Sequence, residues 1–194
     1  MAQTAESAKV DAAHDVVEFL IGQHMQIRDL FTEVDKSTGK ARRDAFERLV
    51  QLLAVHETAE EQLIHPLVRA GVQGGDDIVA DRLSEEREAK VMLARLEDVG
   101  PEGAEFGSLL AELRASVLMH AHNEEAYEFR YLRREVPTAK LQPLVGMVRA
   151  AEAVAPTHPH PGVESAAANT AAGPLMSLFD RTKDMVREAM STNR

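Results

Sequence analysis

The chain has 194 residues, which suits one domain with a sizeable core plus an appendage. Its 22 basic and 32 acidic residues give a net charge of −10, which argues against nucleic acid or an anionic membrane as a main partner. Cysteine is absent, which excludes disulfides, cysteine nucleophiles and thiolate metal sites, and the low aromatic content of 4% requires a largely aliphatic core.

The N-terminal sequence shows no basic region followed by an apolar run, so it predicts no secretory signal. No apolar stretch approaches the roughly 20 residues needed to span a bilayer. We therefore expect a cytoplasmic protein without a membrane partner.

Four amphipathic segments rich in Ala, Leu, Glu and Arg follow one another along the chain, each with apolar residues at a helical period. They predict helices over residues 11–35, 42–70, 77–98 and 105–135. Short Gly- or Pro-containing connections separate them, as expected for neighbouring antiparallel helices. The predicted fold is all-α, an antiparallel up-down-up-down four-helix bundle over residues 11–136.

A helical appendage is predicted after the bundle. Residues 138–153 form a short extra helix, residues 154–173 a linker rich in Pro, Ala and Gly, and residues 174–191 an amphipathic C-terminal helix. The last helix has an apolar stripe suited to docking on the bundle or on a second copy, so the sequence leaves a monomer and a homodimer open.

The second helix carries polar residues where its core-facing stripe should be apolar. His56 and Glu60 are four residues apart and therefore lie on one face, one turn above the other. A buried carboxylate without a partner is costly, so something must neutralise Glu60. A metal ion is the first candidate.

The same pattern recurs in the fourth helix, where His120 and Glu124 lie on the inward stripe, and the first helix places His24 on its own. One His-x3-Glu pair carries little information. Two such pairs on core stripes, together with a third core histidine, predict a metal site of nitrogen and oxygen ligands. Such ligands suit iron or manganese, with zinc as a further option.

These motifs resemble the hemerythrin-like, HHE cation-binding family. The resemblance covers roughly residues 16–132 and is clearest in four segments, LIGQH (20–24), HETAEE (56–61), LSEEREAK (83–90) and HAHNEE (120–125). The linker and the final helix are similar to those of actinobacterial members. The family implies a four-helix bundle with a non-haem di-iron centre and chemistry with O₂, H₂O₂ or NO. The matching ligand positions are His24, His56, Glu60, His120 and Glu124.

The third helix departs from the family pattern, because Arg87 stands where a histidine ligand is normal. A guanidinium has no lone pair for a metal. Three outcomes are open: Glu86 replaces the lost imidazole, the site holds one metal or two with an open position, or Arg87 pairs with Glu60 and Glu124 in a metal-free bundle. The predicted function is accordingly binding, sensing or catalase-like detoxification of a small oxidant, and the sequence does not decide whether the protein is an enzyme. The alternative is a metal-poor structural or interaction bundle.

Other polar residues receive more ordinary expectations. Glu57 lies about 100° off the core stripe and is expected to be solvated or to support a ligand. His65 lies about 140° around the helix from Glu60, so we expect it outside the ligand set. Tyr127 and Tyr131 continue the stripe of the fourth helix, where core packing is the main expectation and a redox-active tyrosine the alternative.

Overall fold

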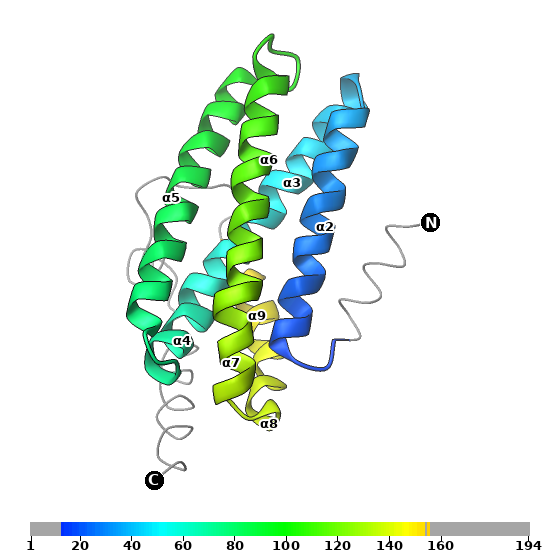
Figure 1. The fold of residues 1–194 in the computed structure, drawn as a ribbon. Coiled ribbons are helices and arrows are strands. Elements are labelled where there is room, and N and C mark those ends of the chain that lie inside the picture. Colours follow the sequence, from blue (N-terminus) through cyan, green and yellow to red (C-terminus); the bar gives the residue numbers. More distant parts are fainter. Residues whose placement is uncertain (1–12, 154, 156–194) are drawn as a thin grey trace.

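A computed structural model describes residues 13–153 and 155, and every regular element within this part of the chain is helical. Four long helices run alternately up and down, which confirms the predicted bundle (Figure 1). The first is α2 (Val16–Lys36) and the third is α5 (Gly75–Val99). The second comprises α3 (Gly39–Ala59), a π-helical segment η1 (Glu60–Ile64) and α4 (His65–Gly71). The fourth comprises α6 (Phe106–Asn123), a π-helical segment η2 (Glu124–Phe129) and α7 (Arg130–Glu135).

Local chemistry sets the ends of these helices. The side chain of Asp15 accepts a hydrogen bond from the backbone N–H of Glu18 (2.8 Å) and caps α2. Helix α2 therefore begins at Val16, whereas the periodicity predicted a start at residue 11, and residues 13–15 are not helical. Gly74 and Gly100 have φ values of +75° and +69°, and they reverse the chain on either side of α5.

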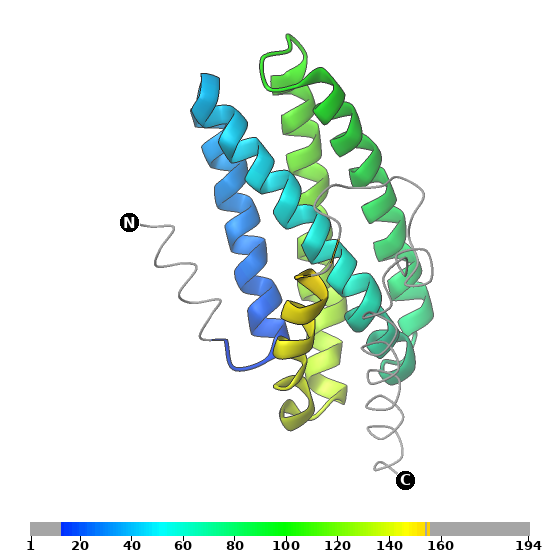
Figure 2. The same cartoon turned by 180° about the vertical axis from the view of Figure 1, so that it is seen from behind.

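The predicted helix over residues 138–153 is two helices, α8 (Thr138–Leu141) and α9 (Leu144–Glu152). Pro143 separates them, because its ring nitrogen has no hydrogen to donate to the preceding turn. Helix α9 lies against α2 and α3 on the back of the bundle (Figure 2). The predicted linker (154–173) and C-terminal helix (174–191) lie outside the described residues, apart from Ala155.

The apolar core is divided into two clusters. One joins the first turns of α2 to α4, α7 and α9, and includes Leu20, Leu63, Phe129 and Leu132. The other joins the far end of α2 to α3, α5 and α6, and includes Phe31, Leu49, Leu96, Phe106 and Leu113. Both lack the polar residues of the predicted site, which form a layer between them.

Among the described helices, none combines the length and apolar character needed to cross a membrane.

Candidate metal centre

The buried polar layer between the two apolar clusters contains all five residues that the sequence predicted as ligands. Glu60 and Glu124 have no solvent exposure at all, and the three histidines are 2–6% exposed. The histidines are His24, His56 and His120. Four histidine and glutamate side chains at 0–2% exposure in the middle of a bundle predict a polar counterpart, because burial without one is costly.

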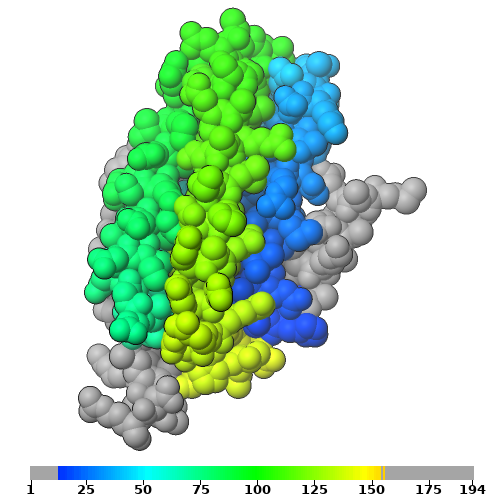
Figure 3. Space-filling view, viewed as in Figure 1, coloured from blue at the N-terminus to red at the C-terminus, as the bar shows by residue number. Residues whose placement is uncertain are grey.

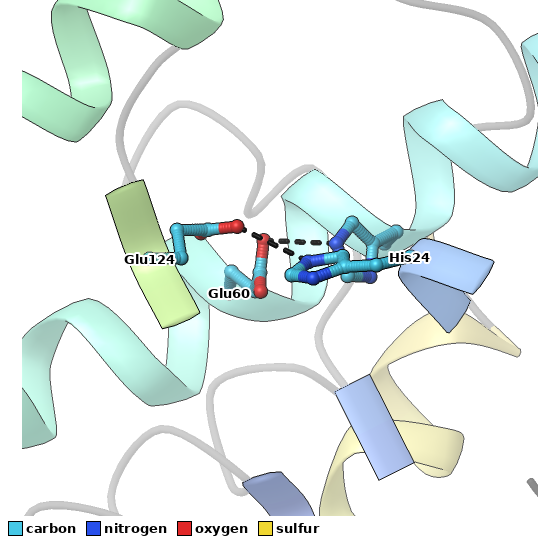
Figure 4. A group of neighbouring side chains, drawn as sticks. His24, Glu60 and Glu124 are labelled. Carbon is cyan, nitrogen blue, oxygen red and sulfur yellow. Dashed lines mark ion pairs between the residues drawn. The ribbon is translucent and has the colours of Figure 1, made fainter. Parts of the chain in front are cut away.

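Three of the four long helices aim their side chains at one point. The Nε2 atom of His56 lies 3.3 Å from Glu60 Oε2, one helical turn away on the same helix. Across the bundle, His24 Nε2 lies 3.2 Å from Glu124 Oε2. His24, Glu60 and Glu124 converge although they come from three different helices (Figure 4). Ligand atoms of these three residues and of His56 all lie within 4.8 Å of one another.

His120 joins this group through the other oxygen of Glu124. Its Nε2 atom lies 3.3 Å from Glu124 Oε1, whereas His24 faces Oε2. The carboxylate of Glu124 thus stands between two histidines, with one oxygen toward each. Each oxygen of Glu124 could therefore serve a cation held by a different histidine.

The far side of each imidazole is held by a hydrogen-bond acceptor. The Nδ1–H group of His56 donates to the side-chain carbonyl of Gln23 (2.9 Å), and that of His24 donates to Glu125 (2.9 Å). Gln23 is itself held by α9, because its amide N–H donates to the Glu152 carboxylate (2.7 Å). In each neutral ring, the Nε2 lone pair is therefore left facing the centre of the bundle.

His120 has the same support from a different helix. Its Nδ1–H donates to Glu85 Oε2 on α5 (2.9 Å). The second oxygen of Glu85 accepts from Asn123 (2.8 Å) and from Arg82 (2.7 Å). Each of the three histidines thus has its own hydrogen-bond acceptor on Nδ1, which fixes the ring and directs Nε2 inward.

The inward-facing atoms fit a bound cation. The Nε2 atoms of His24 and His120 and both oxygens of Glu60 and Glu124 are buried and have no hydrogen-bond partner among the described residues. Their polar contacts include the histidine–glutamate ion pairs at 3.2–3.3 Å. Buried polar atoms nearly always make hydrogen bonds, so six that make none require an explanation. A metal ion coordinated by imidazole nitrogens and carboxylate oxygens supplies it, and this donor set suits iron or manganese better than a soft metal.

The carboxylates and imidazoles shift one another's pKa values. Burial, together with the nearby Glu124 carboxylate, raises the pKa of Glu60 well above its ordinary range. Burial also lowers the pKa of His56 to about 3. His120 is shifted the other way: although burial opposes its charge, the Glu124 carboxylate raises its pKa well above 6.5. The same contact holds the pKa of Glu124 well below its usual range, against the effect of burial.

A second group of buried ionisable side chains, which the helical period does not predict, adjoins the first. His65 is 2% exposed, and its two ring nitrogens contact Glu86 (2.7 Å) and Glu128 (2.9 Å). Although burial opposes the imidazolium, the Glu128 and Glu86 carboxylates raise the pKa of His65 to about 10. Lys90 lies 3.7 Å from Glu86 Oε2 and also hydrogen-bonds Glu61.

The position of His65 follows from the π-helical segment η1. A π turn holds one more residue than an α turn, so every later residue is rotated back by about 100°. His65, expected about 140° from Glu60, is brought within about 40° of it and faces the interior. The segment η2 does the same after Glu124: Glu128, Phe129 and Leu132 are buried, and Tyr127 is 54% exposed. The expectation that the two tyrosines continue the core stripe was therefore wrong for Tyr127, and Tyr131 is only partly buried.

The third helix turns Glu86 inward and Arg87 outward. Glu86 is fully buried, whereas Arg87 is exposed. The ion pairs of Glu60 and Glu124 are with histidines. The expected alternative, in which Arg87 neutralises those two glutamates, is therefore wrong. Glu57, expected to be solvated or to support a ligand, is 6% exposed, and burial raises its pKa to about 8.

A small enclosed cavity of about 10 Å³ lies beside the three histidines. Its other walls are mainly apolar and come from Ile27, Leu53 and Val117. This is the space of about one water molecule. Only a very small molecule could occupy it without moving the surrounding side chains.

Comparison with known proteins agrees with this architecture. The sequence matches the family described as Hemerythrin HHE cation binding domain over residues 15–132. A solved structure of a hemerythrin HHE cation binding domain-containing protein from Mycobacterium kansasii superposes with a TM-score of 0.64 at 19% identity, covering 72% of this chain and 85% of that one, and it shows the shared fold.

A curated relative from Nostoc sp. (strain PCC 7120 / SAG 25.82 / UTEX 2576), named DNA nickase, is 26% identical over 120 residues. The matched region is 61% of this chain but only 34% of the relative, so the chain spans about a third of that protein's length. The family match, by contrast, covers more than half of the chain described here, and the chain belongs to the hemerythrin HHE cation-binding family.

Proposed function

We propose that this protein holds non-haem iron in its buried polar layer and uses it to bind, sense or detoxify a small oxidant: O₂, H₂O₂ or NO. The observation that carries the proposal is the buried group of His24, His56, Glu60 and Glu124, whose ligand atoms all lie within 4.8 Å of one another. The ligands would be His24, His56, Glu60, His120 and Glu124. Manganese and zinc are the other cations that this donor set accepts.

Two metal ions suit the site better than one. Glu124 faces His24 with one oxygen and His120 with the other, so it can bridge. Glu86 would supply the carboxylate of the third helix in place of the imidazole that the family pattern expects. Its Oε2 atom is buried, makes no hydrogen bond and lies 3.7 Å from Lys90 Nζ, which leaves that oxygen for a ligand role.

When bound, iron would supply the redox chemistry that binding of O₂ or NO, or the two-electron disproportionation of H₂O₂, requires. The chain's own part is to hold the imidazoles by their Nδ1–H groups and to exclude bulk water. The small, mainly apolar cavity beside the histidines has room for about one water-sized molecule, which favours a diatomic ligand or peroxide over larger substrates. A nucleic-acid substrate is disfavoured by the net charge of −10.

Metal analysis tests the proposal directly. Protein purified from iron-supplemented cells should contain between one and two irons per chain, and His56→Ala should lose most of it. His122→Ala is the matched control, because His122 is exposed and lies outside the site. Less than about a tenth of an equivalent of iron or manganese in the wild type would contradict the proposal, since a preformed site of this kind should retain its metal.

Three assays on the same preparation then distinguish H₂O₂, O₂ and NO as the small molecule that the site uses. Oxygen release from H₂O₂ that disappears in His56→Ala indicates catalase-like turnover. Spectral changes on addition of O₂ or NO, without turnover, indicate binding or sensing. Iron-loaded protein that responds to none of the three would contradict the oxidant part of the proposal and leave the metal site standing.

A further inference from the structure

A second and larger cavity lies between α5 and the η2–α7 part of the fourth helix. Its volume is about 600 Å³, enough for a small organic molecule. The two segments that line it are neighbours on the face of the molecule in Figure 3. The lining includes Arg82, Asn123, Tyr127, Tyr131 and Arg134. None of these residues is among the proposed iron ligands.

Arg82 gives this cavity its main recognition element. Its side chain is 5% exposed, and one terminal nitrogen donates to Glu85 (2.7 Å). Its Nε–H group, however, is buried and has no acceptor among the described residues. A buried charged donor without an acceptor is destabilising, and a carboxylate oxygen is the acceptor that guanidinium geometry fits best.

The rest of the lining defines the body of the ligand. Tyr127 and Tyr131 lie one turn apart and present aromatic surface, and the guanidinium of Arg134 lies 4.7 Å from the centre of the Tyr131 ring. Exposed Asp81 also lines the cavity, and its negative charge disfavours a ligand with two or more charges. A single carboxylate on an apolar body fits all of these groups.

Arg82 also connects the cavity to the metal centre. Glu85 accepts from Arg82 and Asn123, which both line the cavity, and its other oxygen holds the Nδ1–H of His120. A carboxylate bound at Arg82 would compete with Glu85 for the same guanidinium. A change in the position of the Glu85 side chain would then alter its hydrogen bond to His120.

We propose that this cavity binds a small apolar monocarboxylate through Arg82, and that binding is transmitted through Glu85 to His120. Neither the binding nor its effect on the imidazole requires a metal. The proposal can therefore fail or succeed independently of the iron site.

The chain offers a built-in reporter for the test. It contains no Trp and only two Tyr, Tyr127 and Tyr131, and both line the cavity. Tyrosine fluorescence of the full-length, metal-free protein therefore reports on this cavity. We expect a saturable change with cyclohexanecarboxylate, which does not absorb where tyrosine does. Cyclohexylamine and cyclohexanol, of the same size with positive or no charge, should bind at least about tenfold more weakly.

Matched arginine variants locate the binding site. Arg82→Lys keeps a cation beside Glu85, and therefore the fold, but removes the planar fork and should raise the Kd for cyclohexanecarboxylate about tenfold. Arg130→Lys, an exposed residue of the same helix as the tyrosines and outside the cavity lining, should leave it unchanged. Equal binding of the amine, no response to the acid, or equal Kd values for both variants would overturn the proposal.

Histidine NMR tests the transmission. In ¹⁵N-labelled metal-free protein, cyclohexanecarboxylate should shift the Nδ1 resonance of His120 and leave that of His56 in place, because His56 is held by Gln23 instead. The shift should be lost in Glu85→Gln if the carboxylate is the connecting group. Binding without any shift at His120 would contradict the transmission.

Discussion

The His56–Glu60 and His120–Glu124 pairs have the same spacing and nearly the same geometry, with 3.3 Å between imidazole Nε2 and carboxylate oxygen in both. Each glutamate also begins a π-helical segment. Their surroundings differ in charge. His56 is held by the neutral amide of Gln23, whereas His120 lies between two carboxylates.

This difference explains why the two copies have opposite electrostatic character. Burial, without a carboxylate on Nδ1, lowers the pKa of His56 to about 3, and Glu60 has its pKa raised. In the other copy, against the effect of burial, the pKa of His120 is raised and that of Glu124 is lowered. Residues on neighbouring helices thus make the same His-x3-Glu motif into two unlike half-sites, His56 with Glu60 and His120 with Glu124.

The largest loss is expected from Glu124→Ala, because Glu124 contacts a histidine with each oxygen. We expect iron content to fall at least about tenfold, since both half-sites lose a ligand. Glu60→Ala removes a carboxylate that pairs with one histidine, and should retain more metal. Elemental analysis of both variants, with circular dichroism to confirm folding, makes the comparison. Equal iron content in the two would argue that Glu124 does not bridge.

Changing the outer acceptors should have a smaller effect. Gln23→Ala and Glu85→Ala each release one imidazole, and we expect metal affinity to fall by about 10- to 100-fold. Glu85→Ala should be the stronger, because it also frees Arg82. Competition with a chelator measures both affinities.

The isosteric change Glu85→Gln serves as the control for this pair. It keeps an acceptor for His120 but makes the two half-sites alike in charge. Recovery of most of the lost affinity in Glu85→Gln would show that geometry matters more than charge at this position. Affinity as low as in Glu85→Ala would show the reverse.

Helix α9 should influence the His56 half-site more weakly still. Glu152 reaches His56 only through Gln23, so Glu152→Ala should lower metal affinity by less than about tenfold. Glu152→Gln keeps a carbonyl acceptor for the Gln23 amide and should restore it. The Nδ1 resonance of His56 in the metal-free protein should move in the alanine variant only. An unchanged resonance in Glu152→Ala would show that α9 does not influence His56.

The bundle and the five ligand positions were predictable from sequence because both depend on one period. Residues such as Leu49, Leu53, His56 and Glu60 share a helix face whether or not their partners are known. The structure agrees that all five predicted residues lie in one buried layer. Their role as ligands remains a prediction.

The residues around the five ligand positions could not be predicted from the helical period. A π turn changes the period in the middle of a helix, and no sequence signal around Glu60 or Glu124 predicts it. The α-helical period therefore predicts the wrong face for His65 and for Tyr127. Contacts between helices, such as those of Gln23 and Glu85, depend on the relative height of two helices, which periodicity does not give.

The smallest effect is expected at Arg87, the residue that departs most visibly from the family pattern. Its side chain is exposed, while its neighbour Glu86 is fully buried, with one oxygen that makes no hydrogen bond. Arg87→His should therefore leave the number of irons per chain unchanged, because an imidazole there would point away from the site. Glu86→Ala should reduce it by about one, since the second half-site would lose its carboxylate from α5. The two substitutions differ by a single position, about 100° around the helix, so together they determine which face of α5 completes the site. A gain of iron in Arg87→His would mean that α5 can turn its outer face inward, and that the His120 half-site is incomplete without it.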